Sequence, residues 1–107
     1  MKDLNPGIAQ TVQWLNEIGF PTCDSGDGET HLYECDRDHA YVVVVAEPEH
    51  MAQTADDLLN HLKSRGIAMN PVGETMPYIQ ADYDPVLGMA FVQIVGVKDS
   101  DLFPGSR

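Results

Sequence analysis

The segment Ala40–Ala46, with the sequence AYVVVVA, constrains the fold of this chain more than any other stretch. Its four consecutive valines are β-branched residues, which favour the extended conformation of a strand. The apolar residues do not alternate with polar ones, and such a run is typical of a strand that is covered on both sides or paired centrally in a sheet. We therefore expect this segment to form the centre of a sheet.

Two amphipathic helices are predicted, one on each side of this strand in the sequence. The first runs from about Pro6 to Ile18, with Asn5 as its N-cap and with Gly19 as the residue that ends it. The second opens at Pro48 and ends at Gly66-Ile67. Its apolar residues recur at helical spacing and are Met51, Ala55, Leu58, Leu59 and Leu62.

The remaining strands are predicted from alternation and turn residues. The last third of the chain predicts a hairpin, with strands over Tyr78–Tyr83 and Met89–Val97 joined by a turn over Asp84–Gly88. A short strand is expected over Thr30–Cys35, after a loop over Pro21–Glu29 that is rich in Pro, Asp, Ser and Gly.

These elements predict the α+β class, with the order α-β-β-α-β-β. We expect a two-layer sandwich in which both helices cover one face of an antiparallel or mixed sheet of about four strands. We expect the 107 residues to form a single domain, because a second core would have too little chain to close. Residues 98–107 are expected to form a loosely held tail.

The chain is strongly acidic, with seventeen Asp and Glu residues against six Lys and Arg residues and a formal net charge of −11. Ten acidic residues and a single basic residue, Arg37, lie between Phe20 and Asn60. Proteins that bind nucleic acids neutralise phosphates with Lys and Arg, so direct nucleic-acid binding is disfavoured. A field of this sign attracts cations or basic protein surfaces.

The sequence also bears on location and redox state. No apolar run approaches the roughly 20 residues of a membrane-spanning helix, and the first residues lack the apolar core of a signal peptide. We therefore expect a cytoplasmic protein without a membrane partner. The two cysteines, Cys23 and Cys35, lack Cys-x-x-Cys spacing, and a cytosolic setting favours free thiols over a disulfide.

The segment from Thr22 to His39 holds the candidate metal ligands. Cys23, His31, Cys35 and His39 supply two thiolates and two imidazoles, a set that zinc accepts tetrahedrally. Their spacing differs from that of structural zinc sites, which begin with a Cys-x2–4-Cys knuckle, and a strand would place His31 and Cys35 about 13 Å apart. The segment therefore predicts either a zinc site or an acidic surface loop with a packed thiol.

Other chemistry in this segment is less complete. The run DSGDGE from Asp24 to Glu29 offers carboxylates to calcium or magnesium, but glycines occupy positions where an EF-hand has ligands. Ser25 lies outside a Gly-x-Ser-x-Gly turn, and an activated cysteine needs positive surroundings that this segment lacks. No lysine follows Gly26-x-Gly28 to hold a phosphate. We predict no catalytic residue here.

A series of short motifs runs along nearly the whole chain: Trp14-Leu15-Asn16, Gly19-Phe20, Asp24-Ser25-Gly26-Asp27-Gly28, His39-Ala40-Tyr41-Val42-Val43, Ile79-Gln80-Ala81-Asp82-Tyr83-Asp84-Pro85 and Gly96-Val97. In this series the chain resembles small uncharacterised proteins encoded by tailed bacteriophages and prophages. The resemblance implies a phage-encoded cytosolic protein that is accessory and not part of the virion. It implies no catalytic residue.

We expect a non-enzymatic accessory protein that binds a basic surface of a host or phage protein through an acidic loop face. The residues expected to make this contact are Asp24, Asp27, Glu29, Asp36 and Asp38. No cofactor is required by this hypothesis. The alternative is a small metal-binding domain or metal-dependent enzyme that holds zinc or another divalent cation in the segment from Cys23 to His39.

The outer face of the predicted sheet offers a further surface. Helices on one side leave the other side partly bare, and that side would carry Tyr78, Gln80 and Phe91. A homodimer could form through this face.

Overall fold

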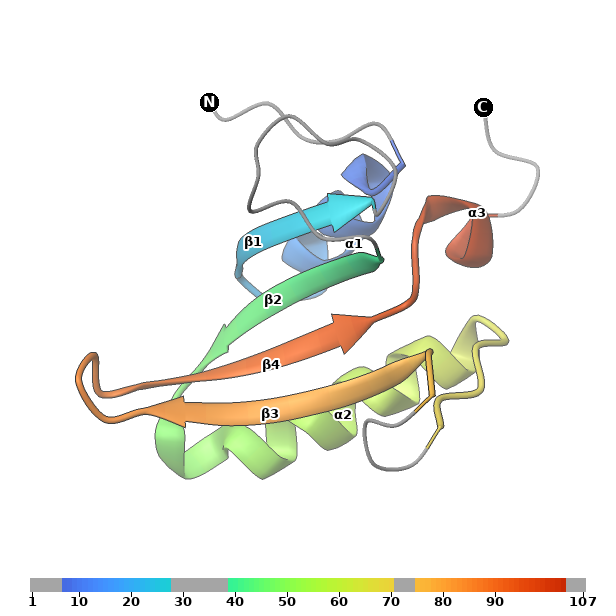
Figure 1. Cartoon of the computed structure of the whole chain (residues 1–107). Coiled ribbons are helices and arrows are strands. Elements are labelled where there is room, and N and C mark those ends of the chain that lie inside the picture. Colours follow the sequence, from blue (N-terminus) through green and yellow to red (C-terminus); the bar gives the residue numbers. More distant parts are fainter. Residues whose placement is uncertain (1–6, 28–38, 71–74, 104–107) are drawn as a thin grey trace.

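The computed structural model describes residues 7–27, 39–70 and 75–103. The fold is α+β with a four-stranded antiparallel sheet, which confirms the predicted class (Figure 1). In chain order the elements are α1 (Ala9–Glu17), β1 (Thr22–Asp27), β2 (Ala40–Ala46), the 3-10 turn η1 (Pro48–His50), α2 (Met51–Ser64), β3 (Tyr78–Asp84), β4 (Met89–Val95) and α3 (Asp99–Leu102).

The strand order is β1-β2-β4-β3, so β2 and β4 are central and β1 and β3 are the edges. The valine-rich segment forms β2 and pairs on both sides, with β1 and with β4. This confirms its predicted central place. The predicted hairpin is also present, because β3 and β4 pair from Tyr78↔Val95 to Asp84↔Met89.

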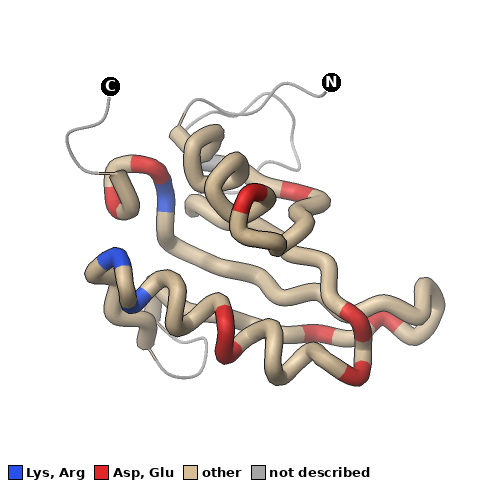
Figure 2. The backbone as a smooth tube through the Cα atoms, turned by 180° about the vertical axis from the view of Figure 1, so that it is seen from behind, with Lys and Arg blue, Asp and Glu red and all other residues tan. Residues whose placement is uncertain are grey.

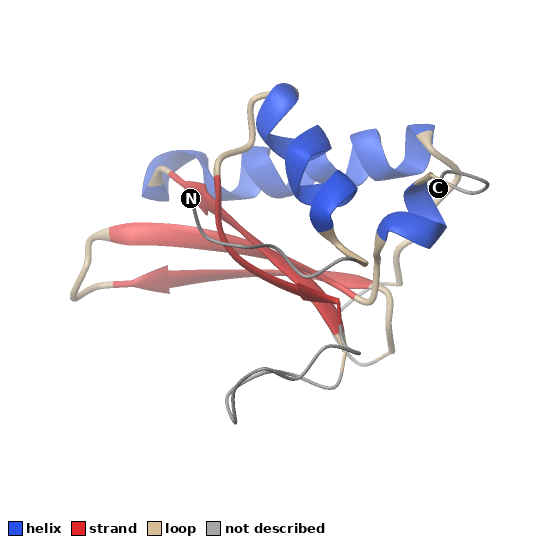
Figure 3. Cartoon of the chain, turned by 90° about the horizontal axis from the view of Figure 1, so that it is seen from above, coloured by secondary structure: helices blue, strands red, loops and turns tan. Residues whose placement is uncertain are grey.

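The core lies between the sheet and the helices, which stand on one side of it (Figure 3). The sheet contributes alternate residues of β2 and β4, and the helices contribute their apolar stripes. The fully buried side chains of this layer include Val42, Val44, Val92, Ile94, Leu15, Leu58 and Leu62. One residue of the predicted stripe departs from this pattern, since Leu59 is 40% exposed.

Both long helices end as predicted, at a glycine followed by an apolar residue. Gly19 and Gly66 have φ angles of 97° and 84°, a conformation that glycine adopts without strain. Phe20 N donates to Leu15 O at 2.8 Å, and Ile67 N donates to Leu62 O at 3.0 Å. These are the long hydrogen bonds of the Schellman motif, and the apolar residue after each glycine packs against the core.

The start of α1 differs from the prediction. The helix begins at Ala9 and not at Pro6, and the predicted cap Asn5 lies outside the described residues. Asp99 caps it instead, since its Oδ1 accepts from Thr11 N and Thr11 Oγ1, each at 2.7 Å, and its Oδ2 accepts from Gln10 N at 3.1 Å. The capping residue therefore comes from 88 positions further along the chain.

The loop predicted over Pro21–Glu29 is wrong for most of its length, because Thr22–Asp27 forms the edge strand β1. Pairing with β2 overrides the turn-forming composition, with a register shift between Thr22 and Asp24. The ring of Tyr41 lies over Gly26, where a Cβ atom would come within 2.6 Å of Tyr41 Cε1. The strand predicted over Thr30–Cys35 lies outside the described residues.

The chain after β4 is integrated in the fold as far as residue 103. Leu102 is buried in the core, and Asp99 caps α1, so the predicted tail is anchored at its start. Arg65 joins α2 to this segment: its guanidinium Cζ lies 4.4 Å from the ring centre of Phe103 and 5.1 Å from that of Trp14. Its Nη1 donates to Leu102 O at 3.1 Å.

Within the described ranges, no helix has the length and apolar character that crossing a membrane requires.

Candidate functional site: the outer face of the sheet

The face of the sheet opposite the helices carries no helix of the described residues (Figure 3). We call it the outer sheet face. Residues two apart on a strand share a face, so the pairing register defines its members. They are Asp24, Gly26, Tyr41, Val43, Val45, Tyr78, Gln80, Asp82, Asp84, Met89, Phe91, Gln93 and Val95.

The middle of this face is apolar. Val43 and Val45 on β2 are half-buried, and Phe91 on β4 stands opposite Val45. Tyr41 and Val95 are almost fully buried at one end of the face, where Tyr41 covers Gly26. An apolar centre on a solvent-facing sheet is a feature of surfaces that bind other proteins.

Carboxylates stand at both edges of the outer sheet face. Asp24 on β1 is exposed, and its Oδ1 lies 2.9 Å from Ser25 N and 3.4 Å from Tyr41 Oη, which both donate to it. Asp82 on β3 is exposed and lies opposite Phe91. The apolar centre is therefore bordered by negative charge on two sides.

The positive charges of the described residues lie elsewhere. Lys63 and Arg65 lie at the end of α2, and Lys98 directly precedes α3. Figure 2 shows the blue segments gathered at one end of the molecule. Among described side chains, the ion pair that forms is His50 Nδ1 with Glu47 Oε2, at 3.2 Å. Asp24 and Asp82 thus have no Lys or Arg partner within the described part of the chain.

The structure places two of the five residues predicted to contact a partner. Asp24 and Asp27 both lie on β1, and the side chain of Asp24 points to the outer sheet face. Glu29, Asp36 and Asp38 lie outside the described residues. The composition of the chain predicted that the site is acidic. The apolar centre could not be predicted in this way, because it depends on strand order and register.

Two of the four predicted metal ligands are described, and they do not share a site. Cys23 lies at the start of β1, whereas His39 precedes β2 beyond the pair Asp27↔Ala40. At about 3.3 Å per residue, four or more residues of strand separate them by roughly 13 Å or more. His31 and Cys35 lie outside the described residues.

The environment of Cys23 opposes nucleophilic chemistry. Its thiol is free, and both desolvation and the neighbouring Asp24 carboxylate raise its pKa above the usual value. A reactive cysteine needs the opposite shift. Ser25 pairs with Val42 and so lies on the side of the sheet that faces the core.

One cluster of potential metal ligands was not predicted. Glu47, Glu49 and His50 bring ligand atoms within 4.8 Å of one another at η1, directly before α2. All three side chains are exposed, and exposed acidic groups of this kind are common without an ion. The sequence could have indicated this cluster, because the three residues lie within one helical turn directly after Ala46.

Comparison with known proteins returns no match to the chain among family models, curated proteins or solved structures.

Proposed function

We propose that this chain is a small non-enzymatic accessory protein that binds another protein through the outer sheet face. The observation that carries the proposal is the apolar centre formed by Val43, Val45 and Phe91 between the carboxylates of Asp24 and Asp82. Apolar cores surrounded by polar rims are the usual anatomy of protein–protein interfaces. In the two-layer sandwich of this proposal, the helices pack against the opposite side of the sheet.

Charge favours a basic partner. The net charge of −11 and the edge carboxylates, which have no Lys or Arg partner among the described residues, favour a negative potential around the outer sheet face. Such a potential accelerates encounter with a positive surface and disfavours acidic competitors. Proteins that bind nucleic acid have positive surfaces, so competition with DNA or RNA for such a partner is consistent with this chemistry.

The resemblance to phage-encoded proteins supplies the biological setting of the proposal. In that setting the chain acts in the cytoplasm of an infected bacterium, on a basic protein of the host or of the phage. The proposal keeps the other residues predicted to contact the partner, which are Asp27 on β1 and Glu29, Asp36 and Asp38, the last three outside the described residues.

The two edge charges provide a direct test of the electrostatic part of this proposal. We expect Asp24→Asn/Asp82→Asn to weaken capture of basic proteins from a bacterial lysate by about fivefold at low salt, at roughly 0.5 kcal/mol for each exposed charge. The melting temperature should change little, because both side chains are exposed. Quantitative mass spectrometry of proteins retained by the immobilised chain gives the measurement.

The matched control is Glu49→Gln/Asp56→Asn, which removes the same charge from exposed positions on η1 and α2. Capture that persists at high salt and survives the Asp24→Asn/Asp82→Asn change would contradict the electrostatic proposal. Capture that is lost on adding a chelator would favour the alternative, a metal-binding domain that uses the segment from Cys23 to His39.

A further inference from the structure

The β3–β4 hairpin exposes an unusual amount of apolar surface. Six large apolar side chains of the described residues are prominently exposed, and four of them belong to this hairpin. Val86 and Leu87, in the turn itself, are 91% and 61% exposed, while Tyr83 and Met89 flank them at 47% and 36%. The turn extends past the start of α2 into solvent (Figure 1). We call Val86 and Leu87 the hairpin tip.

Three hydrogen bonds order the backbone of the hairpin tip. Asp84 Oδ1 accepts from Val86 N at 2.9 Å and from Leu87 N at 3.2 Å, and Asp84 O accepts from Gly88 N at 2.8 Å. Gly88 has a φ of 66°, which closes the turn without strain. A fixed apolar projection loses little conformational entropy when it binds, which favours association.

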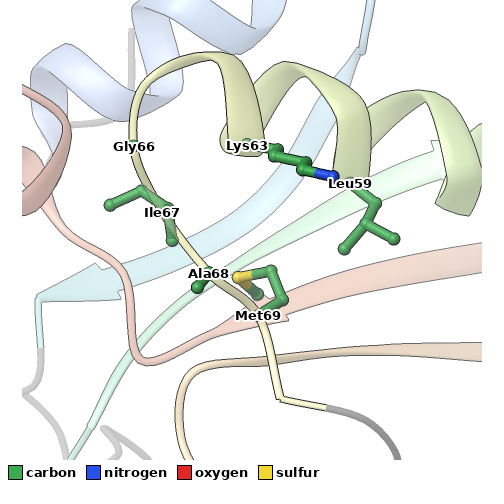
Figure 4. Close-up of a pocket in the computed structure, with 6 residues that line it drawn as sticks. All are labelled: Leu59, Lys63, Gly66, Ile67, Ala68 and Met69. Carbon is green, nitrogen blue, oxygen red and sulfur yellow. The ribbon is translucent and has the colours of Figure 1, made fainter.

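A groove at the other end of α2 has matching chemistry. It has a volume of about 420 Å³ and is lined by Leu59, Lys63, Gly66, Ile67, Ala68 and Met69 (Figure 4). Leu59 leaves 40% of its surface exposed there. The lining is therefore mainly apolar, with one ammonium group at its border.

The charges around the two features are opposite. The strand that leads into the hairpin tip carries Asp82 and Asp84, and Glu47 follows Ala46 at the same end of the sheet. The groove carries Lys63, with Arg65 next along the chain. Both basic residues lie at the C-terminal end of α2.

Within one molecule the hairpin tip cannot reach the groove. α2 has 14 residues and is about 21 Å long at 1.5 Å per residue, and the two features lie at its opposite ends. A contact between them therefore joins two copies. Because the two surfaces differ, the contact is heterologous and repeats from copy to copy unless the rotation closes a ring.

We propose that the hairpin tip of one copy inserts into the groove of a second copy and assembles the chain head to tail. Val86 and Leu87 fill the apolar groove, while Asp82 and Asp84 approach Lys63. A net charge of −11 opposes most encounters between copies, and this orientation brings opposite charges together. The contact involves Asp82 at the edge of the outer sheet face but not the apolar centre of that face, so the assembly and the proposed function can fail separately.

Two exposed variants test the assembly. We expect the wild-type mass in sedimentation equilibrium to rise steadily with concentration. Val86→Asp/Leu87→Asp replaces the apolar side chains of the tip with charged ones, and Leu59→Asp does the same to the groove lining. Each variant alone should associate at least tenfold more weakly than the wild-type protein. An equal mixture of the two variants should form a one-to-one dimer and stop there, since it contains one intact tip and one intact groove.

Three results would overturn the assembly proposal. They are a wild-type protein that stays monomeric across the concentration series, a mixture of the variants that forms no dimer, and a dimer that persists in both variants alone. The last result would point to a symmetric contact such as the outer sheet face. Melting curves of both variants establish that they are folded, as their exposed positions lead us to expect.

Discussion

Asp99→Ala is expected to lower the free energy of unfolding by about 2–4 kcal/mol. The carboxylate of Asp99 accepts three hydrogen bonds from the first turn of α1, two of them from Thr11. Thr11 is completely buried, so its hydroxyl would lose a partner where water cannot replace it. The substitution therefore lowers the free energy of unfolding in two ways, because α1 loses its cap and the buried hydroxyl of Thr11 loses its acceptor.

Chemical denaturation of the variant gives this free energy directly. Asp101→Ala is the matched control, because Asp101 caps only the four-residue helix α3 through Lys98 N at 3.0 Å. Thr11→Val provides a second comparison. The double variant Thr11→Val/Asp99→Ala should lose much less unfolding free energy than the two single variants lose in sum. Equal, small effects of Asp99→Ala and Asp101→Ala would show that the cap on α1 contributes little.

Gly96→Ala is expected to cost about 2–4 kcal/mol of unfolding free energy. Gly96 has a φ of 87°, and an added Cβ would lie 2.7 Å from Met76 Cβ and 3.2 Å from Pro77 Cα. The substitution therefore combines backbone strain with a steric conflict that involves the main chain. Gly96 also donates from its N to Ala40 O at 2.7 Å, so a shift would disturb β2 as well.

Gly66→Ala separates these two contributions. Gly66 has a similar φ of 84°, but a Cβ there would meet no atom within 4 Å. We expect this control to cost about 1 kcal/mol, which is the backbone contribution alone. Thermal and denaturant unfolding of both variants gives the two losses of unfolding free energy. Equal losses for Gly96→Ala and Gly66→Ala would contradict the steric explanation.

Local signals in the sequence predicted much of the fold. The four valines of β2 and the glycine stops at Gly19 and Gly66 depend on conformational preferences of a few neighbouring residues. The hairpin from Tyr78 to Val95 similarly follows from alternation and a turn that contains Pro and Gly. Such elements form where local preference and tertiary packing agree.

The elements that were missed depend on distant partners. The cap of α1 comes from Asp99, which no local pattern links to Thr11. β1 has the composition of a turn, and it becomes a strand because β2 offers a pairing edge and because Tyr41 covers Gly26. Tertiary contacts of this kind override intrinsic strand preference.

The candidate site was predictable in its charge but not in its shape. The acidic residues around Asp24 are visible in the composition, and Phe91 was expected on the outer side of the sheet. The juxtaposition of Val43, Val45 and Phe91 requires β4 to pair with β2, which is not its neighbour in the sequence. That order arises from long-range pairing, so the apolar centre between two acidic edges emerged only from the structure.

The most direct test of the central claim is capture of proteins by the chain with Phe91→Lys, compared with Ala52→Lys. Both changes add one positive charge, the first at the apolar centre of the outer sheet face and the second on exposed α2. Mass spectrometry of the retained proteins should show basic partners whose recovery falls at least tenfold with Phe91→Lys and is unchanged with Ala52→Lys. Equal recovery with both folded variants would contradict binding through the outer sheet face.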